Sequence, residues 1–536
     1  MTSIHLHSKQ KNDTERYGDI RQVRLFAMIA GFVLLIACIN FINLATARAA
    51  GRAREVGLRK VIGAQRETLI AQFLGESFVI TGIATALALL LLRMVLPMYN
   101  THLGRELTLL GPNPTGTTAM LVGLYLLVSL LAGLYPAFYL TSFRPKSILQ
   151  GEVTRGKRGA RARKALVVFQ FTISVALMAC ISVVASQMQY LRGKDLGYHR
   201  ENILTFPLTD ALRSHWKEQK ARFENLPGVE GITASKRIPS GGLYDSPGTQ
   251  VEIDGTLQWI DFSMPHVRVE PTFLDVYGVE MVAGRDFDPM RASDFTEAYV
   301  VNESAAHAMG FERMSDVLGT TVKPLGYELG QIIGVCRDFH YETLRNRIQP
   351  IIIYPSGEVN TVSIRIAGAS TASTIRAIAE TWESIHPGGT FDYTFLDEHL
   401  AALYHDDRRM MQMFIAFGAL AVVIACLGLV GLATFAAERR RREIGVRKTL
   451  GASVQSIVGL LTGEFSVLVL LGSIVAVPIA WFGMRAWLGT FAYRIDLELW
   501  HFPAAFGAAL LIALASVSWQ AFRAASINPV DALRQE

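Results

Sequence analysis

Two short segments of the chain repeat the same charged pattern. Residues 54–64 read REVGLRKVIGA and residues 442–452 read REIGVRKTLGA, with seven of eleven positions identical. Carboxylates and guanidinium groups fixed on a short helix can form charge-assisted hydrogen bonds with a protein partner. Basic residues alone would suit anionic lipid headgroups, but the shared glutamates and glycines favour the protein partner. The residues predicted to make this contact are Glu55, Gly57, Arg59, Lys60 and Gly63 in the first copy, and Glu443, Gly445, Arg447, Lys448 and Gly451 in the second.

Other candidate sites for chemistry are weak. Residues 151–157 (GEVTRGK) have the glycine spacing of a phosphate-binding loop, but Arg158 stands where a serine or threonine should reach magnesium. His340 and residues 405–407 (HDD) are interpreted as satisfied surface or junction residues, since neither belongs to a metal-ligand or nucleophile motif. We therefore predict no catalytic residue, no metal site and no ATP hydrolysis by this chain alone.

The composition predicts an integral membrane protein. Of the 536 residues, 51% are hydrophobic and 18% are charged, and the mean hydropathy is +0.29. A bilayer core of ~30 Å requires about 20 apolar residues of helix. We predict seven spans, at about residues 25–47, 69–92, 117–140, 165–191, 410–437, 465–484 and 499–522.

The spans contain little ionisable chemistry. Glu76 and Glu464 lie toward the ends of two spans, where snorkelling or capping accounts for them. A proton- or sodium-driven carrier usually carries charged groups near the middle of the membrane. An ion-coupled carrier is therefore the least favoured function.

The net charge of +6 reflects topology. Arginine and lysine cluster after the first span, between the third and fourth spans, and after the fifth span. Short basic loops mark the cytoplasmic side of a membrane. Residues 192–409 have mixed charge, so we expect this segment outside the cytoplasm and the carboxyl terminus inside. The predicted partner of the basic loops is thus a bilayer or a protein, and no nucleic-acid partner is expected.

The charged segments belong to a longer internal repeat. An offset of 388 residues aligns both segments, and it also aligns Glu76 with Glu464. Each copy runs span, basic loop, span, outer turn and span in the same orientation, which is a parallel repeat about an axis along the membrane normal. A leading span at 165–186 and the large outer segment precede only the second copy. We therefore expect that the first half lacks its own leading span and outer domain.

The outer segment, residues 187–409, has the composition of an α+β domain. Runs rich in β-branched and aromatic residues predict strands at 202–207, 331–335, 351–354 and 361–366. Helical periodicity predicts helices at 216–225, 303–309 and 371–385. The predicted fold class is an α-helical multi-pass membrane protein with seven spans, a parallel repeat and one α+β extracytoplasmic domain.

Several motifs together resemble a known family. The charged segments, each followed by a span with Glu76 or Glu464, are similar to the FtsX-like domain of MacB-type ABC permeases. Residues 225–230 (NLPGVE), 282–287 (VAGRDF) and 333–340 (IGVCRDFH) resemble that family's periplasmic core domain. The implied parts are a remnant of a first periplasmic domain (1–24), a first FtsX-like three-span unit (25–143), a basic cytoplasmic linker (144–164), a leading span (165–186), a periplasmic core domain (187–409) and a second three-span unit (410–536).

The resemblance implies a non-catalytic permease subunit of an ABC transporter in the inner cell membrane. A separate cytoplasmic ATPase dimer would hold the ATP and Mg²⁺ and dock on the charged segments, and its closure would move the outer domain to export or extract a substrate. A periplasmic or outer-membrane partner is a further implication. A membrane receptor or regulator, whose outer domain controls an extracytoplasmic partner without transport, remains the alternative.

Overall fold

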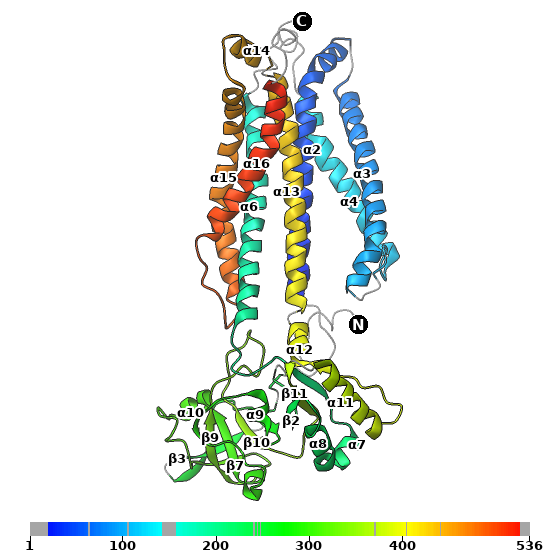
Figure 1. The fold of residues 1–536 in the computed structure, drawn as a ribbon. Coiled ribbons are helices and arrows are strands. Elements are labelled where there is room, and N and C mark those ends of the chain that lie inside the picture. Colours follow the sequence, from blue (N-terminus) through cyan, green and yellow to red (C-terminus); the bar gives the residue numbers. More distant parts are fainter. Residues whose placement is uncertain are drawn as a thin grey trace.

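A helical bundle and an α+β domain lie end to end in the structure of this chain, which is a computed structural model (Figure 1). It describes residues 20–525, apart from 63–64, 104–106, 142–156, 240–241, 244, 247, 254, 369–370, 404 and 440. Most of the predicted remnant at 1–24, and residues 144–156 of the predicted linker with most of its phosphate-loop-like segment, lie outside the described residues.

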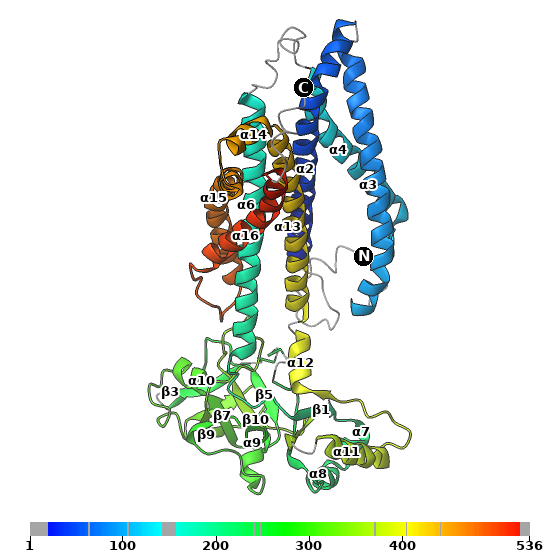
Figure 2. The same ribbon diagram turned by 45° about the horizontal axis from the view of Figure 1, so that its top comes forward.

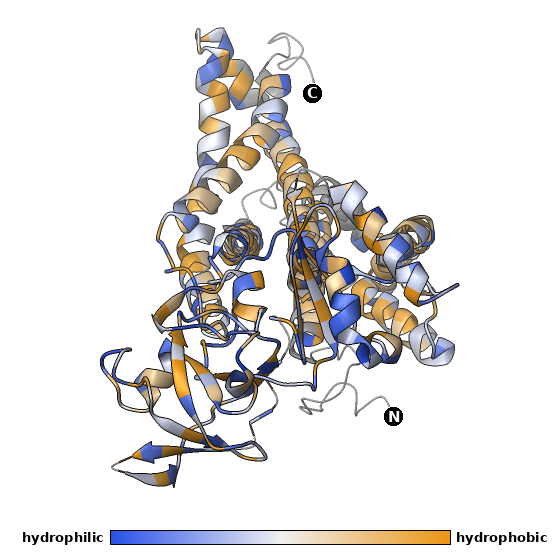
Figure 3. Cartoon of the chain, turned by 60° about the horizontal axis from the view of Figure 1, so that its bottom comes forward, coloured by the Kyte–Doolittle hydropathy of each residue, from blue (hydrophilic) through white to orange (hydrophobic). Residues whose placement is uncertain are grey.

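Within the described residues, seven helices are long and apolar enough to cross a membrane. They are α2 (Ile20–Val61), α3 (Arg66–Leu103), α4 (Pro114–Thr141), α6 (Lys157–Gly193), α13 (His405–Arg439), α15 (Val454–Leu488) and α16 (His501–Ala525). Each contains one predicted span, which confirms the fold class. Apolar residues run along these helices, whereas the strands and loops of the other domain alternate between polar and apolar residues (Figure 3).

The bundle contains the two copies of the repeat. Helices α2, α3 and α4 pack together as α13, α15 and α16 do, and α2 and α13 run side by side in the same direction (Figures 1 and 2). Asn40 on α2 donates its amide to the carbonyl of Ile424 on α13 at 3.2 Å. Gly428 occupies the repeat position of Asn40, and a Cβ on Gly428 would lie 2.4 Å from the Asn40 Oδ1. The two copies therefore meet at equivalent positions on equivalent helices.

The two copies differ in what covers them. Helix α6 packs on α15, α13 and α16. On α15, Leu468 is 7% exposed and Ala476 is fully buried, whereas their repeat counterparts on α3, Ile80 and Ala88, are exposed, Ile80 to 49%. At these two positions α3 is open where α15 is buried.

The outer domain, which we define as residues 194–403, is built on a mixed twelve-stranded sheet in the order β12-β1-β11-β2-β5-β10-β7-β9-β8-β3-β4, with β6 paired to β9. The strands are β1 (Ile203–Pro207), β2 (Val229–Ser235), β3 (Thr249–Ile253), β4 (Thr256–Trp259), β5 (His266–Val269), β6 (Met281–Gly284), β7 (Ala298–Asn302), β8 (Thr321–Pro324), β9 (Gly330–Cys336), β10 (Ile352–Pro355), β11 (Thr361–Ile366) and β12 (Thr394–Phe395). All four predicted strands are present. The β3–β4 hairpin and several short strands were not predicted.

Short helices accompany this sheet: α7 (Asp210–Ser214), α8 (Trp216–Glu224), α9 (Phe273–Tyr277), α10 (Glu303–Ala308), α11 (Thr371–Ile385) and α12 (Leu396–Leu403). The three predicted helices correspond to α8, α10 and α11. Strands β2 and β5 pair through one residue pair, Ser235 with Val269. Separate apolar cores lie on either side of this connection, one around Phe206 and Trp382 and the other around Tyr299 and Val335. The outer domain therefore has two lobes (Figure 2).

Candidate functional site

The second charged segment forms its own short helix, α14 (Arg441–Thr449), at the end of the bundle farthest from the outer domain (Figure 1). The turn after α14 contains Gly451, which has a φ of +90°, a conformation that side chains rarely adopt. The backbone N–H of Ala452 then donates to the carbonyl of Arg447 at 2.9 Å, which satisfies a terminal carbonyl. Ser453 caps the start of α15 by accepting the Ser456 N–H at 3.2 Å. Gly451 thus has a structural role in the turn.

One face of α14 is anchored and the other is presented outward. Ile444 is buried against Ile457 of α15 and Ala521 of α16. On the outward face, Glu443 and Arg447 form an ion pair at 2.8 Å and are about half exposed. An i, i+4 pair of this kind supports the helix by about 0.3–0.5 kcal/mol. The glutamate therefore has a local partner, and the pair remains accessible to other molecules.

The first charged segment is part of a continuous helix. α2 runs to Val61, so Glu55 and Gly57 lie within its last turns, although the side chains of residues 51–58 lie outside the described part of the chain. The Arg59 guanidinium is exposed and donates to the Gln72 amide oxygen of α3 at 3.0 Å. Gly63 is not among the described residues.

Both copies expose a large aliphatic residue at the same repeat position. Ile62 is 77% exposed and Leu450 is 81% exposed. Each follows the basic pair of its segment, Arg59-Lys60 or Arg447-Lys448, within three residues. Protein interfaces combine an apolar core with a polar rim, so an exposed aliphatic residue beside a charge cluster suits a protein partner.

The two span-end glutamates stand at equivalent positions in α3 and α15. Glu464 forms an ion pair with Lys164 of α6 at 2.7 Å. The sequence explained this glutamate by snorkelling or capping, but the structure shows a link between two helices. Glu76 is partly buried on α3.

The outer end of the bundle contains a junction that the sequence analysis missed. The fully buried side chain of Gln187 on α6 donates to the carbonyl of Tyr493 at 3.0 Å and accepts the N–H of Ile495 at 2.9 Å. Tyr493 and Ile495 belong to the loop between α15 and α16. Gln187 is one of three glutamines in the predicted span, with Gln170 and Gln189. Its partners lie about 300 residues away in the sequence, so no local pattern singled it out.

The same loop contacts the face of the outer domain that points toward the bundle. The rings of Tyr493 and His340 meet edge to face, with centroids 4.6 Å apart. The N–H of Ala492 donates to the carbonyl of Arg345 at 3.1 Å, and the Arg345 guanidinium lies over the Phe491 ring. His340 is buried at this junction. Burial, with Lys194 nearby, lowers the pKa of His340 to about 4.

Comparison with known proteins places the bundle in a family. Residues 27–145 and 415–529, which hold α2 to α4 and α13 to α16, each match the family described as FtsX-like permease C-terminal. The chain carries two FtsX-like permease domains. This match confirms the predicted resemblance to the permeases of ABC transporters.

Curated relatives of this permease are similar over part of their length. The macrolide export ATP-binding/permease protein MacB of Neisseria gonorrhoeae is 23% identical over 343 residues, which is 57% of the permease and 49% of that protein. The protein of the same name from Campylobacter jejuni is 30% identical over 130 residues, 24% of the permease and 20% of that protein. The permease thus spans half or less of the length of these relatives. The solved periplasmic region of MacB from Actinobacillus actinomycetemcomitans aligns with 14% identity and a TM-score of 0.28, covering 40% of the permease and 98% of that chain.

Proposed function

We propose that this chain is the non-catalytic permease subunit of an ABC transporter, and that it converts ATP hydrolysis by a separate cytoplasmic ATPase dimer into movement of the outer domain. The ATPase would hold the ATP and Mg²⁺. The observation that carries the proposal is the repeated charged sequence with an exposed aliphatic residue at the same repeat position, Ile62 in one copy and Leu450 in the other. Two copies of one such segment suit a partner with two equivalent subunits.

A continuous set of contacts supports transmission along the second half. Ile444 joins α14 to α15 and α16. The loop between α15 and α16 is held to α6 by Gln187 and rests against the outer domain through Tyr493. A force on α14 would therefore reach the outer domain through packed helices and directed hydrogen bonds, without a substrate path through the bundle.

The test exchanges the charges of the α14 pair. In the double variant Glu443→Arg with Arg447→Glu, the pair is reversed but retained, so the helix keeps its internal ion pair. We expect ATPase activity that co-purifies with the tagged permease to fall by at least about tenfold, because the loss of ~1.4 kcal/mol of binding has that effect. Adding Leu450→Glu should deepen the loss.

The matched control exchanges another exposed ion pair. Glu280 and Arg337, on the outer domain, lie 2.6 Å apart and are 61% and 57% exposed. Their exchange should leave ATPase co-purification unchanged. Retention of the ATPase by a variant with the charges reversed in both segments, at Glu55 and Arg59 as well as at Glu443 and Arg447, would refute the docking assignment. A wild-type permease that co-purifies with no ATPase at all would instead favour the receptor or regulator.

A further inference from the structure

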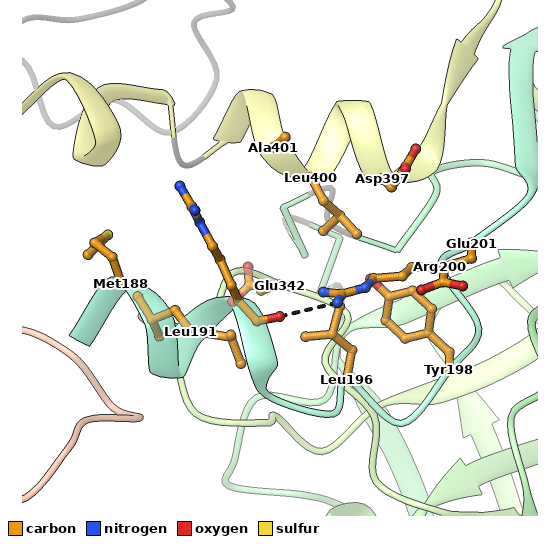
Figure 4. Close-up of a pocket in the computed structure, with 12 residues that line it drawn as sticks. Met188, Leu191, Leu196, Tyr198, Arg200, Glu201, Glu342, Asp397, Leu400 and Ala401 are labelled. Carbon is orange, nitrogen blue, oxygen red and sulfur yellow. Dashed lines mark hydrogen bonds between the residues drawn. The ribbon is translucent and has the colours of Figure 1, made fainter. Parts of the chain in front are cut away.

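Two cavities adjoin each other where the outer domain meets the bundle. The first, which we call the apolar cavity, has a volume of about 400 Å³. Its lining combines seven apolar or aromatic residues, from the outer end of α6, from α12 and from the loops beside them, with five charged residues, Arg192, Arg200, Glu201, Glu342 and Asp397. Figure 4 shows Leu400 pointing from α12 toward Tyr198 and Arg200, with Met188 and Leu191 of α6 facing the same space. Met188 and Leu191 are almost completely buried.

The second cavity is polar and has a volume of about 570 Å³. The two cavities share part of their lining, namely Leu196, Tyr198, Arg200 and Glu201. The lining of the polar cavity includes three basic residues (Lys194, Arg200 and Arg365) and three acidic residues (Asp195, Glu201 and Glu230). Both volumes lie within the range of about 300–1,000 Å³ that is typical of small-molecule sites.

The polar groups around the shared wall are held in place. The Arg200 guanidinium donates to the carbonyl of Arg192 at 3.2 Å, which ties the loop to the last turn of α6. The Asp195 carboxylate accepts the N–H of Gly197 at 2.9 Å. Arg365 lies 3.4 Å from Glu230 and donates to backbone carbonyls of α9. A preorganised polar surface with balanced charge suits a headgroup of little net charge.

We propose that the two cavities form one binding site for a single-chain amphiphile with a zwitterionic headgroup. The acyl chain would occupy the apolar cavity beside Leu191 and Leu400, and the headgroup would occupy the polar cavity beside Arg200. This inference rests on the proposed function, because it names the class of substrate that the moving outer domain would handle.

The position of the site agrees with this assignment. The candidate span of α6 ends at Gly193, so Met188 and Leu191 lie in its last two turns, where the helix leaves the apolar part of a bilayer. The opposite wall is α12, which leads into α13. The cavity therefore lies between α6 and α12, the helices through which the chain enters and leaves the outer domain (Figure 2). A displacement of one relative to the other would change the space available to an acyl chain.

The experiment uses lysophosphatidylethanolamine with a photoactivatable diazirine at the end of its acyl chain, added to the full-length permease in nanodiscs. Illumination should label residues of α6 and α12 around the apolar cavity. Leu400→Trp, which fills the cavity, should lower this labelling by at least about fivefold, the effect of losing ~1 kcal/mol of binding. Leu400→Ala leaves the cavity open and should retain the labelling.

Ala402→Trp, on the exposed side of α12, is the matched control and should leave the labelling unchanged. Lysophosphatidylglycerol with the same photoactivatable chain should label the site less, because its headgroup is anionic. Labelling spread evenly over the bundle, or equal labelling of wild type and Leu400→Trp, would overturn the proposal. ATPase co-purification is measured on the same preparations, so a failed ligand site with an intact ATPase complex is distinguishable from a failed function.

Discussion

Gln187 fastens the outer end of α6 to the loop between α15 and α16, and its removal tests the junction directly. Its amide makes one bond as donor, to the carbonyl of Tyr493, and one as acceptor, from the N–H of Ile495. The variant Gln187→Leu retains a similar volume but makes neither bond. Each backbone group left without its partner costs about 1–3 kcal/mol when it is buried.

The expected cost for each of the two backbone groups lies at the low end of this range, about 1 kcal/mol. Tyr493 and Ile495 are only partly buried, so water can replace some of the lost bonding. We expect the loop to lose about 2 kcal/mol of protection in total, which corresponds to roughly 30-fold faster amide exchange at Ile495. Hydrogen–deuterium exchange of the full-length permease in nanodiscs, read on peptides covering residues 489–497, measures this change.

Two further variants separate the bonds from general effects. Gln187→Glu keeps an acceptor for Ile495 and removes only the donor, so its exchange rate should be intermediate. Gln189 is exposed on the same helix, and Gln189→Leu should leave the loop unchanged. Unaltered exchange of residues 489–497 in Gln187→Leu would refute the view that this side chain holds the junction together.

Two other predictions concern packing and pH. A Cβ on Gly472 would lie 2.8 Å from the Phe171 Cβ of α6, so Gly472→Leu should destabilise the bundle by about 1–3 kcal/mol. The control is its repeat counterpart Ala84, which is exposed. In parallel thermal melts, Ala84→Leu should change stability by less than about 0.5 kcal/mol. In the outer domain, burial and the nearby Arg268 lower the pKa of His266 to about 4, which favours the neutral ring in the folded state. The stability from this residue is present above the unfolded pKa of about 6.5 and should fall by about 2 kcal/mol at pH 5. His266→Gln should flatten this part of the pH profile of thermal unfolding, and an unchanged profile would contradict the assignment.

The elements were predictable where one local signal decides them. Spans follow from uninterrupted apolar length, and strands such as β9 and β11 follow from their β-branched residues. In β11, the buried residues Val362, Ile364 and Ile366 alternate with Ser363 and Arg365.

The β3–β4 hairpin was overlooked although a local signal was present. Leu257 and Trp259 alternate with Thr256 and Gln258 in β4, and the dipeptide Asp254-Gly255, which is common in two-residue hairpin turns, precedes them. All four residues of β4 are exposed, so no burial reinforces the pattern.

The candidate site could be predicted only in part, because its geometry depends on contacts between distant parts of the chain. The repeat located the charged segments, but the sequence interpretation assigned their glycines and glutamates to a partner. The structure gives Gly451 and Glu443 local roles, in a left-handed turn and an intrahelical ion pair. The more informative residue is Leu450, whose exposure depends on the packing of α14 by Ile444 and could not be read from hydrophobicity. The ion pair of Lys164 with Glu464 joins residues 300 positions apart, so no local sequence pattern predicts it.

The two copies of the repeat differ in which helices and loops pack on them, and this difference affects how each would move the outer domain. In the second copy, α15 packs on α6, and its outer loop is bonded to α6 and to the outer domain. In the first copy, α4 packs on α3 and on α2, and α3 and α4 lie apart from the outer domain (Figures 1 and 2). In the proposed function, a movement that starts at Arg59 would reach the outer domain through the contacts of α2 with α13, where Asn40 meets Gly428, and with α6. Two nearly identical charged segments would thus drive the outer domain by different routes, one through directed hydrogen bonds and one through a helix interface without room for a larger residue than glycine.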